Sequence, residues 1–274
     1  MRVYEEDRSV EIPIRFLVRG EGYKLLGLFE SDLRLFGTDD GGTIFLFGTD
    51  TLGRDLLSQV IHASRISLSI GLIGVFLSLF IGLIMGGIAG FYGGTVDELI
   101  NRFMEILLSF PSIPLWMALS AALPPTWSML QVYFGITVIL SLVGWTGLAR
   151  QIRGRILSIK AEDYIVAARL TGCSTSRIIG AYMLPMSASH IIASLTLSIP
   201  GMILGETALS FLGIGLRRPT VSWGVLLRQA QDLQMLFFGP WLLIPGIFVV
   251  LAVLAFNFLG DGIRDASDPY HSSV

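Results

Sequence analysis

The chain has 274 residues, of which 53% are hydrophobic and only 15% are charged, and its mean hydropathy is +0.70. Soluble domains carry about 25% charged residues, so this composition indicates a membrane protein and argues against a soluble one. The net charge of −2 gives no indication of a nucleic-acid partner, and the single cysteine, Cys173, can form neither an internal disulfide nor a cysteine metal cluster.

Residues 1–66 form a polar N-terminal segment. They contain 11 acidic and 8 basic side chains and no apolar stretch of the kind found in a signal peptide. The distribution of basic residues, described below, predicts that this segment is extracytoplasmic. Moving so many charges across a bilayer without a preceding span is difficult. Either the first span carries the segment outward or a further span precedes residue 1, and we favour the second explanation.

Long stretches without Asp, Glu, Lys or Arg locate the membrane spans, and these stretches are 66–96, 106–149, 178–205 and 233–260. About 20 apolar residues cross a bilayer core. The second stretch is too long for one span and is broken by Pro124-Pro125, so it holds two helices. We therefore predict an all-α, polytopic membrane helix bundle with about five spans, at residues 67–91, 104–123, 130–149, 187–211 and 236–259.

Small residues recur at every fourth position of the first span, namely Gly74, Ser78, Gly82, Gly86 and Gly90. This spacing places them on one helix face, and small side chains let two helix backbones approach closely in lipid. Packing within the chain is the favoured interpretation. A contact with another subunit, or a seam that moves, is the alternative.

Basic residues indicate how the bundle is oriented. The loop at 150–186 holds six of them, whereas the loop at 212–235 holds three. The positive-inside rule places the first loop in the cytoplasm. Within a transmembrane domain at 67–260, the five predicted spans then leave residues 1–66 outside and the tail at 261–274 in the cytoplasm.

The cytoplasmic loop contains a candidate docking element at residues 164–185. Ile165, Ala167, Ala168 and Leu170 suit a short helix, Gly172 can adopt the left-handed conformation that ends it, and Ser174 can cap the next helix. Leu184-Pro185 closes the element before the fourth span. Two short helices at an angle would form a protrusion that fits a groove on a partner protein. The alternative is an amphipathic helix that lies on the lipid headgroups.

Glu206 is the clearest polar residue inside a predicted span. A carboxylate at the centre of a membrane helix costs roughly 2.5–3.5 kcal/mol on insertion scales, so it should face protein or water. Glu206 either lines the substrate path or is hydrogen-bonded to a neighbouring helix, and the residues alone favour neither explanation.

Catalytic motifs are not evident in the sequence. A P-loop requires a Gly-Lys-Ser or Gly-Lys-Thr ending, but the two lysines, Lys24 and Lys160, are followed by Leu25 and Ala161. The zinc-protease, serine-hydrolase and paired-cysteine motifs are also missing. We predict that the chain is not an enzyme and uses no cofactor or metal.

The loop at 164–185 resembles the EAA coupling motif of ABC-importer permeases. Ala167-Ala168, Gly172 and Leu184-Pro185 match that motif, whereas Val166 stands at the position of its glutamate. Three further stretches resemble the second-type permease of the dipeptide/oligopeptide (peptide/nickel) family, namely 48–55 with 63–68, 206–215 with 222–224, and 256–269. Together they cover about residues 45–270 in the family's order.

The resemblance implies the fold of a type I ABC importer transmembrane domain, usually with six spans, in a bacterial-type cytoplasmic membrane. It implies a heterodimer with a second permease, two cytoplasmic ATPase subunits and an extracytoplasmic substrate-binding protein. ATP hydrolysis then occurs in the partner subunits. The residues expected to contact an ATPase subunit are Ala167, Ala168, Leu170, Thr171, Gly172, Cys173 and Ser174.

For the outer face we nominate Asp50, Arg54 and Asp55. The alternative is a local turn, in which Asp50 caps a helix that enters the bilayer and Arg54 pairs with a nearby carboxylate. The cargo expected from the resemblance is a peptide, with nickel chelates, glutathione or opines as alternatives. A secondary transporter without an ATPase would show inverted repeats or several intramembrane charges, and only Glu206 fits that description.

Overall fold

The computed structural model describes residues 13–25, 29–38 and 44–266, and the chain divides into two compact units, Met1–Leu57 and Ser58–Val274. In the first unit, β1 (Ile14–Leu25) pairs antiparallel with β2 (Phe29–Thr38), so that Phe16 lies opposite Phe36. This hairpin was not predicted from the sequence. The described apolar side chains on it are not buried in a core, as Phe16 is 79% exposed, so no strong alternation of buried and exposed residues marks the described part of its strands.

The second unit is helical, and its first helix begins two residues before the boundary. The membrane-length helices are α1 (Leu56–Tyr92), α4 (Met129–Ile159), α8 (Ala188–Phe211) and α11 (Ile244–Ala266). The shorter elements are α2 (Gly94–Ser109), α3 (Ser112–Ala121), α5 (Asp163–Leu170), α6 (Thr175–Arg177), the π-helix η1 (Ile178–Met183), α7 (Leu184–Met186), α9 (Trp223–Leu227), the 3₁₀-helices η2 (Arg228–Gln231) and η3 (Pro240–Leu243), and α10 (Leu233–Phe238).

Five crossings are formed if α2 and α3 together make one span. The two helices meet at an angle of 84° on either side of Pro111, within the span that we predicted at 104–123. That prediction was wrong in its start, because α2 begins at Gly94. Phe110 adopts an extended conformation (ψ 137°) because it precedes Pro111, and a proline disfavours the helical conformation in the residue before it.

Three other predicted boundaries also differ from the structure. The first span was predicted to begin at residue 67, after an N-terminal segment at 1–66, but α1 begins at Leu56 because the helix extends beyond its apolar part. The predicted third span ended at residue 149, but α4 continues to Ile159. Arginine is a good helix former, so the charges that begin at Arg150 mark the edge of the apolar segment and not the end of the helix. The predicted last span began at 236, but Gly239-Pro240 separates α10 from η3 and α11.

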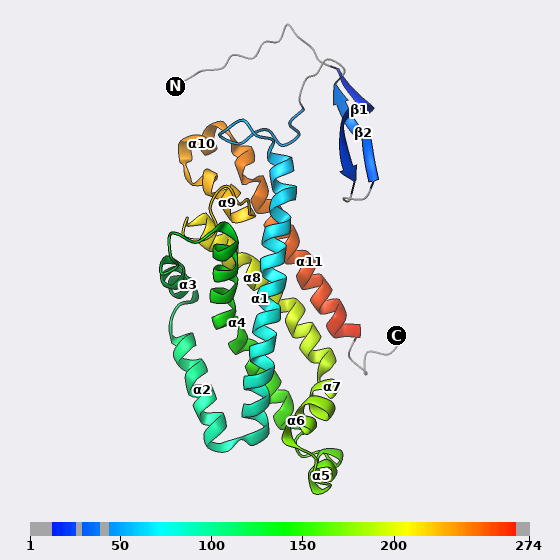
Figure 1. The fold of residues 1–274 in the computed structure, drawn as a ribbon, viewed down its shortest axis with the longest axis vertical. Helices are drawn as coiled ribbons and strands as arrows, with labels where there is room; N and C mark the ends of the chain where they lie inside the picture. Colours follow the sequence, from blue (N-terminus) through cyan, green and yellow to red (C-terminus); the bar gives the residue numbers. More distant parts are fainter. Residues whose placement is uncertain (1–12, 26–28, 39–43, 267–274) are drawn as a thin grey trace. The chain divides into compact units, whose positions relative to one another are not determined.

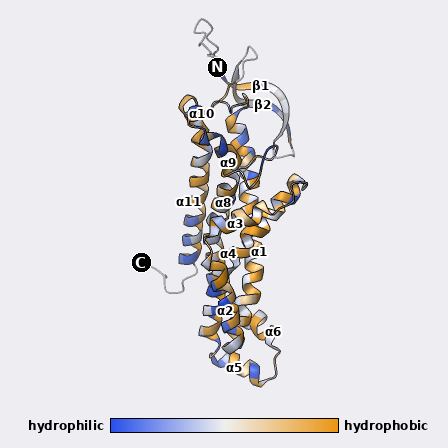
Figure 2. Cartoon of the chain, turned by 90° about the vertical axis from the view of Figure 1, so that its left-hand side faces the viewer, coloured by the Kyte–Doolittle hydropathy of each residue, from blue (hydrophilic) through white to orange (hydrophobic). Residues whose placement is uncertain are grey.

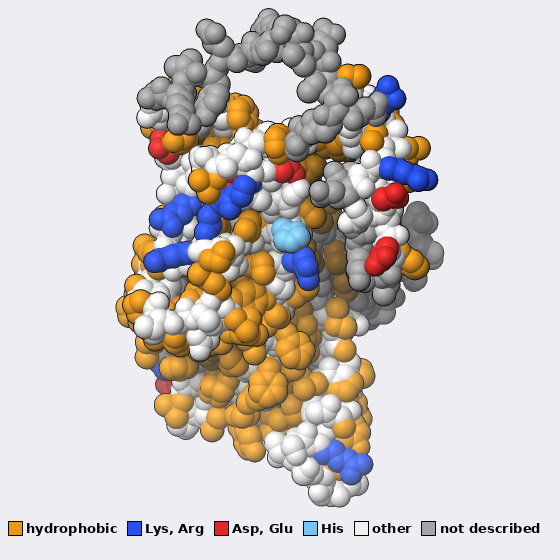
Figure 3. All heavy atoms as spheres, turned by 45° about the horizontal axis from the view of Figure 1, so that its top comes forward, with side chains coloured by type: hydrophobic (Ala, Val, Ile, Leu, Met, Phe, Trp, Pro, Cys, Tyr) orange, Lys and Arg blue, Asp and Glu red, His pale blue; other side chains and the backbone are white. Residues whose placement is uncertain are grey.

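Four of the short helices, α5, α6, α9 and α10, lie at two opposite ends of the bundle (Figure 1). The turn between α1 and α2 lies at the same end as α5 and α6, whereas α9 and α10 lie at the other end. Apolar residues run along the helices between these ends (Figure 2), and Figure 3 shows an apolar surface below a zone that carries most of the visible charged side chains. This distribution of apolar residues matches the predicted membrane helix bundle.

The small-residue face of α1 packs against α4. A Cβ atom at Gly86 would lie 2.4 Å from the carbonyl oxygen of Ala149, and one at Gly90 would lie 2.9 Å from that of Arg153. The Ser141 hydroxyl also donates to the Gly74 carbonyl at 3.0 Å. The favoured interpretation, packing within the chain, is confirmed.

Candidate coupling site

The loop after α4 forms a compact helical element, α5–α7. The first helix of this element, α5, ends just before Gly172, as we predicted. The N–H of Cys173 donates to the Ala168 carbonyl at 3.1 Å, and that of Gly172 donates to the Arg169 carbonyl at 3.0 Å. These two bonds are the Schellman motif, which requires a left-handed residue at the position after the helix. Gly172 supplies that residue with φ 80°.

One side of α5 anchors the element to the bundle. Ile165 and Ala168 are buried and pack in one apolar cluster with Ile156 of α4 and with Ile178 and Met183 of η1. Phe91, at the end of α1, belongs to the same cluster. A displacement of α5 would therefore reach α1, α4 and the segment that leads into α8, because close-packed side chains transmit strain.

The opposite side of α5 faces away from the bundle. Leu170 is 84% exposed, and Ala167, Thr171, Gly172 and Ser174 are also exposed. Ala168 differs from the other predicted contact residues, because it is only 8% exposed and its side chain faces the bundle.

Two predicted residues flank the start of α6. Cys173 is partly buried beside the apolar cluster. Ser174 occupies the N-cap position of α6 as expected, but its side chain makes no capping hydrogen bond. Its hydroxyl lies 3.4 Å from that of Ser176 instead.

Charged side chains make contacts at the base of this element. Arg169 of α5 lies over the Phe91 ring at 4.6 Å from the centroid, and Lys160 lies at 5.8 Å. Such contacts attract a cation to the face of an aromatic ring. Asp97 of α2 forms a bidentate ion pair with Arg153 of α4. This ion pair joins α2, and with it α3, to α4.

Glu206 lies on α8 and is completely buried (0% exposed). Its carboxylate accepts hydrogen bonds from three serine hydroxyls, those of Ser67 (3.2 Å), Ser210 (2.7 Å) and Ser222 (2.7 Å). Ser67 belongs to α1, and Ser222 is the N-cap of α9. This geometry favours the second of the two explanations for Glu206, a carboxylate satisfied by its neighbours.

Asp50 and Arg54 form a local turn. The Asp50 carboxylate accepts from the backbone N–H groups of Leu52 (2.8 Å) and Arg54 (3.0 Å), and it pairs with the Arg54 guanidinium at 2.8 Å. Asp50 therefore caps the turn before α1, and the predicted pairing of Arg54 with a nearby carboxylate is present. Asp55 directly precedes α1 and forms an isolated β-bridge with Thr49.

Comparison with known proteins identifies the family. Residues 66–270, which include α5–α7 and Glu206, match the family described as "Binding-protein-dependent transport system inner membrane component". The chain belongs to this family. Among its relatives, the dipeptide transport system permease protein DppC of Bacillus subtilis is 39% identical over 225 residues, which are 81% of this chain and 68% of that protein. The oligopeptide transport system permease protein OppC of Haemophilus influenzae is 41% identical, over 81% of this chain and 70% of its own length.

Solved structures agree with the helical fold of this family of transport components. A chain of the MetNI methionine ABC transporter in an inward-facing conformation has a TM-score of 0.59 at 17% identity, over 77% of this chain and 97% of that one. A chain of an amino acid ABC transporter has a TM-score of 0.53 at 14% identity, over 76% and 94%. The family match, the permease relatives and the apolar helices long enough to cross a membrane together make the chain a multi-pass membrane permease subunit and not a catalytic one.

Sequence reasoning missed the residues that hold Glu206 in place. Ser210 could have been found, because it lies four residues after Glu206 on the same helix face. Ser67 and Ser222 come from segments far away in the sequence, and nothing local links them to the carboxylate. The pairing of Asp97 with Arg153 was missed for the same reason, since 56 positions separate the two residues.

Proposed function

We propose that this chain is one permease subunit of an ATP-driven importer that moves peptides across a bacterial-type cytoplasmic membrane. The observation that carries the coupling role is the exposed outer side of α5, held on a buried apolar base. The peptide cargo is supported by relatives named dipeptide and oligopeptide permeases, which are about 40% identical over four-fifths of the chain.

The proposed importer needs partners, because its energy comes from ATP and a P-loop is missing from this sequence. Two ATPase subunits would bind the cytoplasmic end of the bundle at α5–α7. A second, different permease would complete the transmembrane pathway, and an extracytoplasmic binding protein would deliver the cargo.

In the proposed mechanism, ATP binding brings the ATPase subunits together and displaces α5. Leu170 and the neighbouring exposed residues would fill a groove on the ATPase subunit. Ile165 and Ala168 would pass the displacement to α1, α4 and η1 through the apolar cluster that they share. The bundle would then alternate between outward-open and inward-open states.

Replacing Leu170 with aspartate tests the coupling role. Leu170 is 84% exposed, so Leu170→Asp should alter the stability of this chain by less than about 0.5 kcal/mol. In an ATPase groove, however, the new carboxylate would be buried without a partner. We expect at least tenfold less ATPase subunit to co-purify with this chain, together with loss of ATP-dependent peptide uptake in proteoliposomes.

Leu233→Asp is the matched control, because Leu233 is 80% exposed on α10 at the opposite end of the bundle. Co-purification of the ATPase subunits should be normal with this variant. Normal co-purification and uptake with Leu170→Asp would contradict the proposed coupling role.

A further inference from the structure

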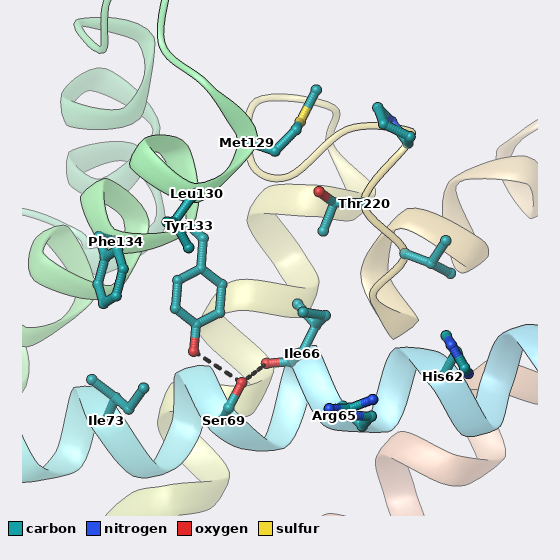
Figure 4. A pocket seen from close by; sticks show the side chains of 12 residues that line it. His62, Arg65, Ile66, Ser69, Ile73, Met129, Leu130, Tyr133, Phe134 and Thr220 are labelled. Atoms are coloured by element: carbon teal, nitrogen blue, oxygen red, sulfur yellow. Dashed lines mark hydrogen bonds between the residues drawn. The ribbon is translucent and has the colours of Figure 1, made fainter. Parts of the chain in front are cut away.

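A pocket of about 790 Å³ opens between α1, α4 and the segment before α9. Figure 4 shows its wall of α1 side chains facing the start of α4. Its lining residues are His62, Arg65, Ile66, Ser69, Ile73, Met129, Leu130, Tyr133, Phe134, Pro219, Thr220 and Val221. The start of α4 and the segment before α9 both lie at the end of the bundle that the basic residues assign to the outside.

The pocket combines apolar walls with a cation. Met129, Leu130 and Phe134 of α4 provide apolar surface, and the hydroxyl of Tyr133 is held by Ser69 at 2.9 Å. Arg65 is exposed, and among the residues that the structure describes it has neither an ion-pair partner nor a hydrogen-bond partner. His62 lies three residues earlier and lines the same pocket.

The chemistry of this pocket suits an anion that is attached to an apolar body. No carboxylate occurs among the described lining residues, so nothing in the pocket neutralises Arg65. A guanidinium binds a carboxylate through two parallel hydrogen bonds. The volume lies within the range of sites for small ligands, about 300–1,000 Å³.

We propose that this pocket receives the C-terminal carboxylate of the peptide cargo as it enters the permease, with Arg65 as the binding residue. This inference rests on the proposed function. Every linear peptide carries that carboxylate whatever its sequence, whereas its side chains vary. A fixed cation between apolar and aromatic walls can therefore hold peptides of many sequences in one orientation.

The test removes the charge from each side of the proposed contact. Uptake into proteoliposomes that hold the complete complex is measured for a tripeptide and for the same tripeptide with a C-terminal amide. Each peptide is supplied at a concentration that saturates the binding protein, so that the selectivity of the binding protein does not set the rate. The wild-type complex is compared with Arg65→Gln, Arg65→Lys and Arg228→Gln.

A hydrogen-bonded charge pair corresponds to about a tenfold effect, so Arg65→Gln should slow uptake of the free acid about tenfold and uptake of the amide less than twofold. Arg65→Lys keeps the charge but loses the paired geometry, and its rate for the acid should be intermediate. Arg228 is exposed at the same end of the bundle and does not line the pocket, so Arg228→Gln should change neither rate. The amount of assembled complex is measured for each variant, and rates are given per complex.

Equal slowing of both peptides by Arg65→Gln would overturn the inference and would assign Arg65 to a contact with the binding protein. Unchanged uptake of both peptides would overturn it as well. If the wild-type complex imported neither peptide, the proposed peptide cargo itself would fail, and this inference would fail with it.

Discussion

Glu206 illustrates how a membrane helix accommodates a carboxylate. Each of the three serines that donate to it also accepts a hydrogen bond from a backbone N–H group, namely those of Trp223 (Ser67), Leu216 (Ser210) and Val225 (Ser222). Buried polar groups are tolerated when such a network is complete. The carboxylate thus fixes the segment between α8 and α9 to the N-terminal part of α1.

Truncating this carboxylate should destabilise the protein. Glu206→Ala leaves three buried hydroxyls without their acceptor, and we expect a loss of about 2–4 kcal/mol in the free energy of unfolding. Glu206→Gln keeps the shape of the side chain and one acceptor oxygen, so it should lower the free energy of unfolding by less than Glu206→Ala does. Thermal unfolding of the purified protein in detergent measures both values.

The same variants separate the two explanations for Glu206. A structural role predicts that stability and uptake fall together in Glu206→Ala. If this variant unfolded like the wild type yet lost peptide uptake, Glu206 would belong to the substrate path.

At the scale of elements, the contact between α1 and α4 depends on glycine. A Cβ atom at Gly86 would lie 2.4 Å from a backbone oxygen and 3.0 Å from the Cα atom of Ala149. Backbone atoms cannot move aside as the end of a flexible side chain can. The two helices must therefore separate to accommodate even one methyl group.

Gly86→Ala should cost about 1–3 kcal/mol in the free energy of unfolding, the usual cost of overpacking a core. Gly147→Ala is the matched control, because Gly147 lies within α4 and a Cβ atom there would meet nothing within 4 Å. That control should be neutral or stabilising by up to about 1 kcal/mol, since alanine favours the helix. Equal unfolding temperatures for the two variants would show that the helices do not approach closely.

The elements also show how far sequence reasoning reaches. Long apolar stretches and the stop at Gly172 are local signals, so four spans and the break after α5 were predicted from residues that are close in the sequence. The angle between α2 and α3 depends on how the two helices pack, and the presence of Pro111 indicates only that the helix is interrupted. The pocket beside Arg65 could not be predicted, because three separate segments form it.

At the scale of the whole molecule, the two ends of the bundle differ in what they present. The end with α5–α7 has an exposed leucine, Leu170, on a buried apolar base, which suits the proposed coupling to an ATPase subunit. The other end has the pocket beside Arg65, which suits the proposed entry of the cargo. The proposed function needs these ends to lie on opposite sides of the membrane, with α5–α7 in the cytoplasm.

The single cysteine tests this orientation without any change to the chain, because Cys173 is partly exposed next to α5. A membrane-impermeant maleimide should label it in inside-out vesicles and not in intact spheroplasts, and bound ATPase subunits should slow the labelling. In a Cys173→Ser background, Leu233→Cys on α10 should show the reverse pattern, since Leu233 is 80% exposed at the opposite end. Labelling of Cys173 in intact spheroplasts would place α5 outside the cell, where a cytoplasmic ATPase could not reach it.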